Sequence, residues 1–413
     1  GVKVSLRQAT GTDGWGNTDT FDSIENIIGS NFDDTIEGDA GANILDGAGG
    51  INTLTYENVT IGGVTVNLSQ EVNNTGSDGI DTIRNFQNLI GSSTQSDNLT
   101  GNDAVNTIKG LGGNDTIDGG KGSDTLYGGA GNDTFKVYLG DGNDTIDGYE
   151  DGTSVDTNDA SNKDTIDYSG ITDTSYHADV DLSAGTPVGR VIKDSDSSVE
   201  QTDTLINIEN VLGSSGNDTI TGSNEANILN GASGDDKFII KGSIADNKGD
   251  VIIGGTHTVI GGTQGMTNAA VGKGDTVDYS NLSDNIILTM ANGTGITNVT
   301  LGADINNHTF SGIENIIGSA AADTITGNSF INTILGGASD DTIDGGDGAD
   351  YLDGGFTDVN NDNLNDEKNT ISFASSAAGV TVNLNTGTTS QSDTLLNFTN
   401  IIGTDLAAQS DNL

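Results

Sequence analysis

The chain has 413 residues, and 61 Asp and Glu outnumber 14 Lys and Arg, so its formal net charge is −47. This charge excludes nucleic acid and an anionic membrane surface as partners and makes cations the natural counterpart. The absence of cysteine excludes disulfides and thiolate metal sites, and without a run of 18 apolar residues no membrane insertion is expected. With 62 glycines and one proline, the composition favours strands and turns.

The two ends of the sequence predict an internal piece of a larger protein. The start, Gly1-Val2-Lys3, has neither an initiator Met nor a signal peptide. The end, Asp411-Asn412-Leu413, stops inside a repeat that has barely begun.

A module of three parts repeats along the chain. The first part is a strand with alternating apolar residues, the second is a hexapeptide such as Ile24-Glu25-Asn26-Ile27-Ile28-Gly29, and the third is a block of nine-residue rows. The predicted strands lie at 2–6, 64–68, 180–182, 286–288 and 380–384, and the hexapeptides at 24–29, 86–91, 208–213, 313–318 and 398–403. The blocks lie at 29–55, 91–148, 213–239 and 318–355, with a fifth opening at Gly403.

A second shared box ends in an aromatic residue where the nine-residue rows give way to wider coils. It lies at 53–56, 165–168, 276–279 and 370–373. We therefore expect modules 1 and 2 at 1–148, module 3 at 149–240, module 4 at 241–355 and a truncated module 5 at 356–413, all on one continuous solenoid.

Each row contains a glycine-rich turn, an acid and a three-residue strand with one inward apolar residue. At about 3.3 Å per strand residue, one row forms half of a flattened coil and two rows close a turn of 18 residues. Every row supplies a large apolar residue at the inward position, which disorder would not do. These sixteen residues are Ile36, Leu45, Leu54, Leu99, Ile108, Ile117, Leu126, Phe135, Ile146, Ile220, Leu229, Phe238, Ile325, Ile334, Ile343 and Leu352. The pattern predicts an all-β solenoid.

Acids two rows apart should stack at the edges of this solenoid. Coils about 4.8 Å apart bring Asp115 close to Asp133 on one edge and Asp124 close to Asp144 on the other, where the carboxylates repel. A divalent ion between them reverses this effect, and calcium suits because it takes six to eight hard oxygen ligands. Glycine permits the positive φ that turns backbone carbonyls toward such an ion.

The rows at 110–118, 119–127 and 128–136 resemble the RTX repeat, GGxGxDxUx. This resemblance implies a parallel β-roll, calcium half-sites built from the first four carbonyls and the Asp of each row, export by a type I secretion system, and folding triggered by extracellular calcium. The implied ligands are Gly110, Leu111, Gly112, Gly113 and Asp115; Gly119, Gly120, Lys121, Gly122 and Asp124; and Gly128, Gly129, Ala130, Gly131 and Asp133. The same pattern adds Gly142, Asp144, Gly336, Gly337, Asp341, Gly345, Gly346, Gly348 and Asp350.

Some rows depart from the pattern, and their half-sites should be weak or empty because a neutral Asn carries no charge. Asn replaces the acid at Asn43, Asn52, Asn106, Asn227 and Asn332, and the fourth-position Gly is lost at Phe32, Ala104, Ala226, Ala321 and Phe330. Calcium should therefore concentrate at 110–148 and 336–355. For Asp34, Asp218, Asp236 and Asp323, calcium binding and capping of their own turn both remain open.

Two acidic insertions stand outside the rows. The loop at 358–366 spaces oxygen donors as an EF-hand does, so Asp358, Asn360 and Asp362 are candidate ligands, although its glycine and terminal Glu are missing. The loop at 151–159 has no such spacing and is expected to be solvated.

No motif predicts an enzyme. His177, His257 and His308 stand in different modules, and the sequence has neither HExxH nor GxSxG. We expect a non-catalytic extracellular protein, a segment of a bacterial surface-layer, matrix or adhesin protein. Its partners would be calcium and either copies of itself in a lattice or fibre or a cell-surface polysaccharide. The alternative is a C-terminal RTX secretion and folding module of an exported enzyme or toxin. Ice binding ranks last because the turns offer no threonine ladder.

Overall fold

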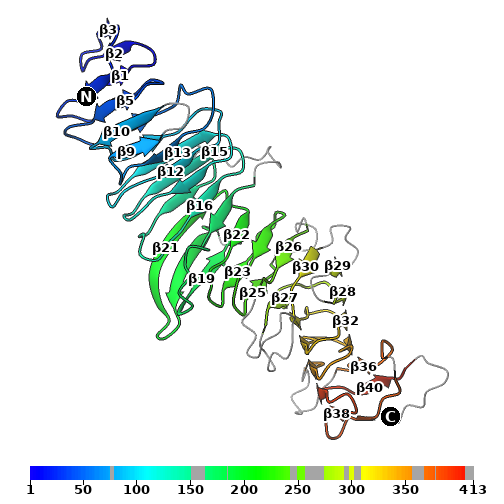
Figure 1. Cartoon of the computed structure of the whole chain (residues 1–413). Helices are drawn as coiled ribbons and strands as arrows, with labels where there is room; N and C mark the ends of the chain where they lie inside the picture. Colours follow the sequence, from blue (N-terminus) through cyan, green and yellow to red (C-terminus); the bar gives the residue numbers. More distant parts are fainter. Residues whose placement is uncertain are drawn as a thin grey trace. The chain divides into compact units, whose positions relative to one another are not determined.

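The computed structural model describes residues 1–74, 79–149, 163–183, 185–241, 249–255, 274–292, 297–301, 308–355, 367–376 and 378–404. Regular structure in these ranges consists of short β-strands (Figure 1), so the predicted all-β class is confirmed. No helix that could span a bilayer occurs in this part of the chain. The chain forms two compact units, one of residues Gly1–Ile171 with Ala184–Asn210 and one of Thr172–Ser183 with Val211–Leu413.

In the first unit, consecutive strands alternate between two faces, and on each face they pair in parallel with strands of the neighbouring coils. One face contains β1 (Lys3–Ser5), β5 (Thr35–Glu37), β7 (Thr53–Thr55), β11 (Asn88–Ile90), β13 (Thr107–Gly112), β15 (Thr125–Ala130), β17 (Thr145–Asp147) and β21 (Ser198–Ile206). The other contains β4 (Asn26–Ile28), β6 (Ile44–Asp46) and β10 (Ile80–Arg84), then β8 (Thr65–Asn67), β12 (Asn98–Thr100), β14 (Thr116–Asp118), β16 (Thr134–Lys136) and β18 (Thr165–Asp167).

The second unit repeats this arrangement. One face contains β19 (Tyr176–Asp181), β23 (Thr219–Thr221), β25 (Lys237–Ile239), β27 (Thr276–Asp278), β31 (Asn315–Ile317), β33 (Thr333–Leu335), β35 (Tyr351–Asp353) and β39 (Thr394–Leu396). The other contains β22 (Asn210–Leu212), β24 (Ile228–Asn230), β26 (Val251–Ile253) and β30 (His308–Ser311), and β28 (Ile286–Thr289), β32 (Thr324–Thr326), β34 (Thr342–Asp344), β36 (Thr370–Ser372) and β40 (Asn400–Ile402).

The register confirms the 18-residue coil. Ile108 on β13 faces Leu126 on β15, and Ile117 on β14 faces Phe135 on β16, each pair being 18 residues apart. All sixteen predicted inward residues are at most 1% exposed, because they fill the narrow space between the two faces. Tyr56, Tyr168, Tyr279 and Phe373, which end the aromatic boxes, are buried in the same core.

Antiparallel strands interrupt the parallel stacks. The sequence pattern did not predict them, apart from β37 (Val382–Asn383), which lies in the predicted strand 380–384. In the first unit β2 (Thr10–Thr12) pairs with β1 and with β3 (Thr18–Thr20), β9 (Val72–Asn74) pairs with β10, and β20 (Val188–Lys193) pairs with β21. In the second unit β29 (Thr297–Leu301) pairs with β28 and β30, and β37 (Val382–Asn383) pairs with β38 (Thr388–Thr389), which also pairs with β39. These strands share too few apolar alternations to stand out in the sequence.

Candidate metal centre

A ladder of carboxylates runs along the turns, directly before each three-residue strand. In a regular row this is the sixth position when the first glycine is counted as one. The Oδ1 atom of each such Asp accepts the backbone N–H of the sixth residue of the coil before it. The N–H of Asp97 donates to Asp115 at 2.7 Å, that of Asp115 to Asp133 at 2.7 Å, and that of Asp124 to Asp144 at 2.8 Å. The same bond joins Asp218 to Asp236, Asp323 to Asp341 and Asn332 to Asp350. These bonds fix each carboxylate at the edge of the stack.

The second oxygen, Oδ2, is buried without a hydrogen-bond partner among the described residues at the rows that match the repeat best. These residues are Asp115, Asp124, Asp133, Asp236, Asp341 and Asp350, all at most 1% exposed. An anionic oxygen buried in this way is costly unless a cation or a donor satisfies it. Their geometry therefore fits a hard metal ion.

At four of these six rows, those of Asp115, Asp133, Asp236 and Asp341, a backbone carbonyl faces the carboxylate oxygen across the first glycine. A Cβ atom added at Gly110 would overlap both Asp115 Oδ2 and the carbonyl oxygen of Gly128, one coil later. The same overlap occurs at Gly336 with Asp341 Oδ2 and the carbonyl oxygen of Gly354. Glycine thus keeps space in which a carboxylate and a carbonyl from adjacent coils converge, and both are oxygen ligands that calcium prefers.

Burial and like charges raise the pKa of these carboxyl groups. Burial, with Asp133 and Asp97 nearby, raises the pKa of Asp115 to about 8. Burial, with Asp144, Asp141 and Asp118 nearby, raises the pKa of Asp124 to about 7. For Asp236, burial and the charges of Asp218 and Asp275 raise the pKa to about 9. The ionised form is disfavoured at each site, as expected of carboxylates that need a cation.

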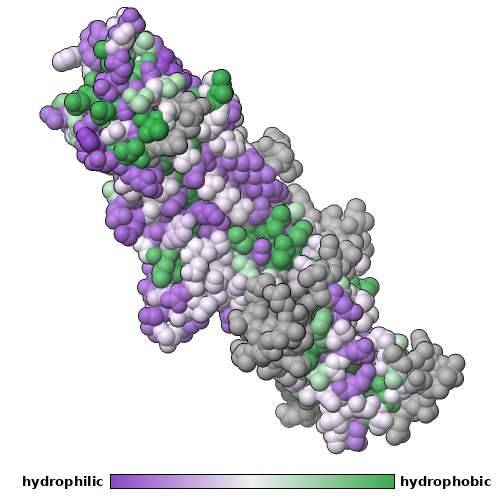
Figure 2. All heavy atoms as spheres, in the orientation of Figure 1, coloured by the Kyte–Doolittle hydropathy of each residue, from purple (hydrophilic) through white to green (hydrophobic). Residues whose placement is uncertain are grey.

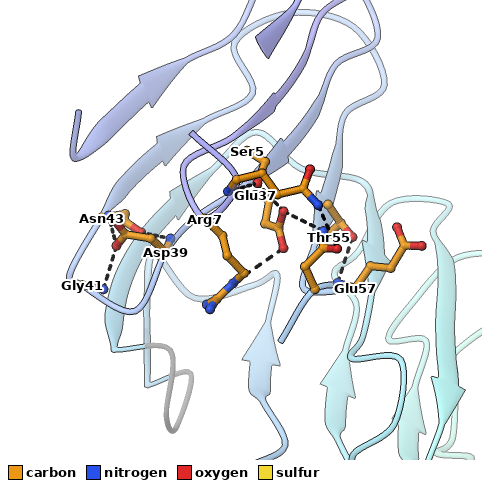
Figure 3. Close-up of polar contacts among 10 residues, drawn as sticks. Ser5, Arg7, Glu37, Asp39, Gly41, Asn43, Thr55 and Glu57 are labelled. Atoms are coloured by element: carbon orange, nitrogen blue, oxygen red, sulfur yellow. Dashed lines mark hydrogen bonds and ion pairs between the residues drawn. The ribbon is translucent and has the colours of Figure 1, made fainter. Parts of the chain in front are cut away.

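Three acids at the ninth position, Glu37, Asp167 and Asp278, have a different environment, because cationic side chains pair with them. Lys136 pairs with Asp167, and Lys237 pairs with Asp278 at 2.7 Å. Figure 3 shows a related pair, in which the Arg7 side chain faces the buried Glu37 with 3.8 Å between Nε and Oε1. Burial opposes ionisation of Asp278, but its hydrogen bond to Lys237 gives a net lowering of its pKa. These ninth-position acids are already neutralised by the protein.

In rows with Asn at the sixth position, hydrogen bonds of the Asn amide satisfy the polar groups of the turn. Asn43 Oδ1 accepts the N–H of Asp39 at 2.8 Å, and its Nδ2 donates to the Glu25 carbonyl of the coil before at 2.9 Å. Figure 3 shows this turn, with Asp39 also accepting the N–H of Gly41. Asn106 and Asn332 use their Nδ2 in the same way, toward the carbonyls of Gln87 and Glu314. The amide N–H₂ of the Asn thus bonds the carbonyl that a cation would bind in a row with Asp at this position.

In rows with Ser directly after the first glycine, the protein itself satisfies the sixth-position carboxylate. The N–H of Ser30, Ser92, Ser214 and Ser319 donates to Oδ2 of the Asp in the same row. Asp34, Asp218 and Asp323 therefore cap their own turns, one of the two roles that the sequence left open. Asp236 differs, because no such donor reaches its Oδ2 from the described part of the chain.

A comparison with family models agrees with this geometry. The model of the RTX calcium-binding nonapeptide repeat matches residues 19–54, 100–135, 136–151, 207–238, 308–329 and 326–358. The chain contains RTX calcium-binding repeats. Such repeats bind calcium ions and are typical of secreted proteins. No curated protein sequence matches the chain.

Other residues predicted as calcium ligands lie in the same RTX turns. Gly113, Gly122, Gly131, Gly142 and Gly348 have φ between 116° and 146°, a region that side chains rarely adopt. Gly120, Gly129, Gly337 and Gly346 also have positive φ, while Gly112, Gly119 and Gly345 line the turns without it. Leu111 is a non-glycine residue with φ 77°, Ala130 ends β15, and Lys121 points to solvent and pairs with Asp103 at 3.1 Å. Asp358, Asn360 and Asp362 lie outside the described residues, as does the acidic loop at 151–159.

Sequence reasoning missed several sixth-position acids because insertions separate them from their glycine turns. Asp164, Asp203, Asp250, Asp275 and Asp393 accept the N–H of Asp133, Asp144, Asn227, Asp236 and Asp350 respectively. Burial and neighbouring acids raise the pKa of Asp164 to about 9. A search for Asp-Thr followed by an aliphatic residue would have found four of the five.

Two glutamates of the hexapeptides take over the same position with longer side chains. The N–H of Asp164 donates to Glu209 Oε2 and that of Asp275 to Glu314 Oε2, each at 2.9 Å. Among the described residues, no cluster of three or more His, Asp or Glu side chains is arranged to hold a metal. This agrees with half-sites in which carboxylates act together with backbone carbonyls rather than with further acids.

Proposed function

We propose that this chain is a non-catalytic structural segment of a secreted surface-layer, matrix or adhesin protein that becomes rigid when calcium binds. The observation that carries this proposal is repetition: each module rebuilds the same strand, hexapeptide and block around the same buried ladder. Repetition of one unit extends a surface and gives length, whereas an enzyme needs one unique cleft.

Calcium would act as the staple of this segment. The chain has no cysteine, and its core is a single layer of side chains between two faces. Calcium between Asp115 and the Gly128 carbonyl, and at the equivalent places, would remove the cost of burying ionised carboxylates. The free energy of calcium binding would then contribute directly to the free energy of folding.

The environment of His308 supports a non-catalytic role. This side chain is fully buried, with its Nδ1 3.9 Å from Asp250 Oδ2 and its ring 6.2 Å from that of Tyr279. A general base must reach the substrate, and a side chain inside the coil cannot do so. We interpret His308 as part of the core.

The alternative is a C-terminal folding and secretion module of an exported enzyme or toxin. The RTX repeats fit both interpretations equally. Five copies of the hexapeptide favour the structural one, because a folding tail has no need for so many modules.

Two measurements test the proposal. Circular dichroism during a calcium titration should show coil converting to β structure, and a chain that is already fully folded in chelator would contradict calcium-coupled folding. Immunogold labelling of intact cells of the source organism should place the protein on the surface and show its release by a chelator wash. Unlabelled cells, with the protein found only in the culture medium as part of a secreted enzyme, would favour the alternative.

A further inference from the structure

Each hexapeptide after the first is joined to the coil before it by the same main-chain contacts, which we call a hexapeptide junction. The N–H groups of its second and third residues both donate to the carbonyl oxygen of one sixth-position residue. For the hexapeptides at 86–91, 208–213, 313–318 and 398–403, these acceptors are Asn52, Asp164, Asp275 and Asn369. Because the backbone contacts are shared, the side chains of the four junctions can be compared directly.

The residue directly before each of these hexapeptides is left-handed, a conformation that Gly and Asn adopt most readily. These residues are Asn85, Asn207, Gly312 and Asn397, with φ of 60°, 52°, 68° and 60°. The carbonyl oxygen of each lies against a glycine that starts a row in the coil before, namely Gly47, Gly148, Gly254 and Gly354. Every junction therefore presents one backbone carbonyl beside the sixth-position side chain.

In the second and fifth junctions, an amide of the protein satisfies this carbonyl. Asn52 Nδ2 donates to the Asn85 carbonyl at 2.9 Å, and Asn369 Nδ2 donates to the Asn397 carbonyl at 3.3 Å. In the second junction Gln87 Oε1 also accepts the N–H of Asn52 at 2.9 Å. These side chains are neutral, so hydrogen bonds alone complete the contact.

In the third junction, acids stand in the places of both amides. Asp164 replaces Asn52, and Glu209 replaces Gln87. The N–H of Asp164 donates to Glu209 Oε2 at 2.9 Å, as the N–H of Asn52 does to Gln87. The backbone and the length of the side chains are thus kept, while two amides become two carboxylates.

The carboxylate of Asp164 consequently faces the carbonyl that an amide would bond. A Cβ atom added at Gly148 would lie 2.3 Å from Asp164 Oδ2 and 2.2 Å from the carbonyl oxygen of Asn207. Asp164 Oδ1 accepts the N–H of Asp133, but no hydrogen bond reaches Oδ2 from the described residues. Two acceptors therefore converge on one place, which only a cation or a proton can reconcile.

The fourth junction repeats this arrangement. At Gly254 an added Cβ atom would lie 2.3 Å from Asp275 Oδ2 and 2.1 Å from the Gly312 carbonyl oxygen. Glu314 Oε2 accepts the N–H of Asp275 at 2.9 Å. Sixth-position Asp thus occurs with Glu in the hexapeptide, whereas sixth-position Asn occurs with Gln87 or Thr399.

Burial makes the acids of the third junction costly to ionise. Hydrophilic residues cover much of the visible surface of the first unit (Figure 2), where water screens charge. Asp147 and Asp164 are instead 1% and 2% exposed. Asp147 Oδ1 accepts Asn207 Nδ2 at 2.8 Å, and its Oδ2 is buried without a hydrogen-bond partner among the described residues. Burial, with the charges of Asp133, Glu209 and Asp147, raises the pKa of Asp164 to about 9.

We propose that one calcium ion lies in the third junction, between Asp164 Oδ2 and the Asn207 carbonyl, and another in the fourth, between Asp275 Oδ2 and the Gly312 carbonyl. Two calcium–oxygen bonds of about 2.3–2.6 Å span such a pair, and all the donors are the hard oxygens that calcium prefers. In the second and fifth junctions the Asn amide takes the place of the ion.

Calcium would therefore fasten the third and fourth hexapeptides to the coils before them, while the second and fifth stay joined without it. These sites lie where insertions interrupt the nine-residue rows, so they extend calcium binding from the rows to the contacts between modules. The inference deepens the calcium-stapled segment proposed above and rests on it.

Exchanging acids and amides between junctions tests the inference on the full chain. Asp164→Asn and Asp275→Asn each place an amide where the ion would lie. The double variant Asn52→Asp with Gln87→Glu is the reciprocal change, which turns a neutral junction into an acidic one. Asp115→Asn, in a regular row, is the reference for loss of a row site. Circular dichroism in calcium checks that each variant is folded.

Native mass spectrometry in calcium counts the bound ions. Asp164→Asn and Asp275→Asn should each bind one ion fewer than wild type, and the double variant should bind one more. In chelator, hydrogen exchange of the amides at 204–212 should be about tenfold slower in Asp164→Asn than in wild type, because the amide satisfies the carbonyl without an ion.

An unchanged ion count in Asp164→Asn, or no gain in the double variant, would overturn the junction sites. A proton on Asp164 that bonds the carbonyl in place of calcium would give the first of these results. If Asp115→Asn still loses an ion, the proposed function stands and only the junction sites fail. If Asp115→Asn loses none either, calcium stapling itself fails.

Discussion

Two blocks of the first unit, 29–55 and 110–136, build the same coil with opposite electrostatics. In the first, Asn43 and Asn52 donate their amide N–H₂ to the carbonyls of Glu25 and Asn85, and Ser30 satisfies Asp34. In the second, Asp115, Asp124 and Asp133 keep a buried oxygen that no described residue satisfies. The polar groups of the turn can therefore be satisfied by donors of the protein or by a cation, and the sixth residue together with the residue after the first glycine decides which.

Calcium removal should produce the largest difference between the two blocks. With excess chelator, the backbone amides of 110–136 should lose their protection against hydrogen exchange, because the ionised carboxylates repel without an ion between them. Those of 29–55 should keep more of their protection. Hydrogen–deuterium exchange with mass spectrometry on the full chain measures both at once, and equal loss in the two blocks would contradict the comparison.

Exchanging the sixth residue between the two kinds of row should exchange their calcium binding and their stability without calcium. Asp115→Asn should reduce the number of bound calcium ions and stabilise the calcium-free block by about 1–3 kcal/mol, because a buried unsatisfied carboxylate is removed. Asn106→Asp is the reciprocal variant, which should add calcium dependence. Isothermal titration calorimetry and urea unfolding in chelator measure the two effects. An unchanged calcium stoichiometry in Asp115→Asn would count against Asp115 as a ligand.

The pH dependence of the calcium-free chain should follow the raised carboxyl pKa values. An unfolded Asp titrates near about 4, whereas burial raises the pKa of Asp115 and Asp341 to about 8 in the folded chain. The folded state therefore binds more protons between these values, so the free energy of unfolding in chelator falls as pH rises from about 4 to about 8. Calcium affinity should rise over the same range because the ion displaces those protons. Urea midpoints at several pH values check the sign, and a rising midpoint in chelator would refute it.

The smallest change in stability is expected for substitutions in the apolar core that runs through both blocks. The Tyr56 hydroxyl is buried without a hydrogen-bond partner among the described residues, and module 5 has Phe373 at this place. Tyr56→Phe should be neutral or stabilising by about 1 kcal/mol, since it removes an unsatisfied polar group. Phe373→Tyr is the reverse control and should destabilise. Thermal unfolding in calcium measures both, and a large loss in Tyr56→Phe would show that the hydroxyl is satisfied in solution.

Much of the fold was predictable because the repeat is local. The nine-residue spacing places Ile117 and Phe135 on the same face of successive coils, and the structure pairs them directly. The strongest candidate rows could be found in the same way, since glycine turn and acid lie within six residues. Asp164 and Asp275 could not, because insertions at 150–162 and 256–273 separate each acid from its turn. Only the bonds from Asp133 and Asp236 reveal that they continue the ladder.

The amino-acid pattern was sufficient to predict the all-β coil, its core residues and the use of calcium, because a period of nine fixes which side chains turn inward and which acids meet. Which acids remain unsatisfied was settled in three dimensions, since that depends on donors such as Ser214 and the Asn43 amide, which reach their acceptors across a turn or from an adjacent coil.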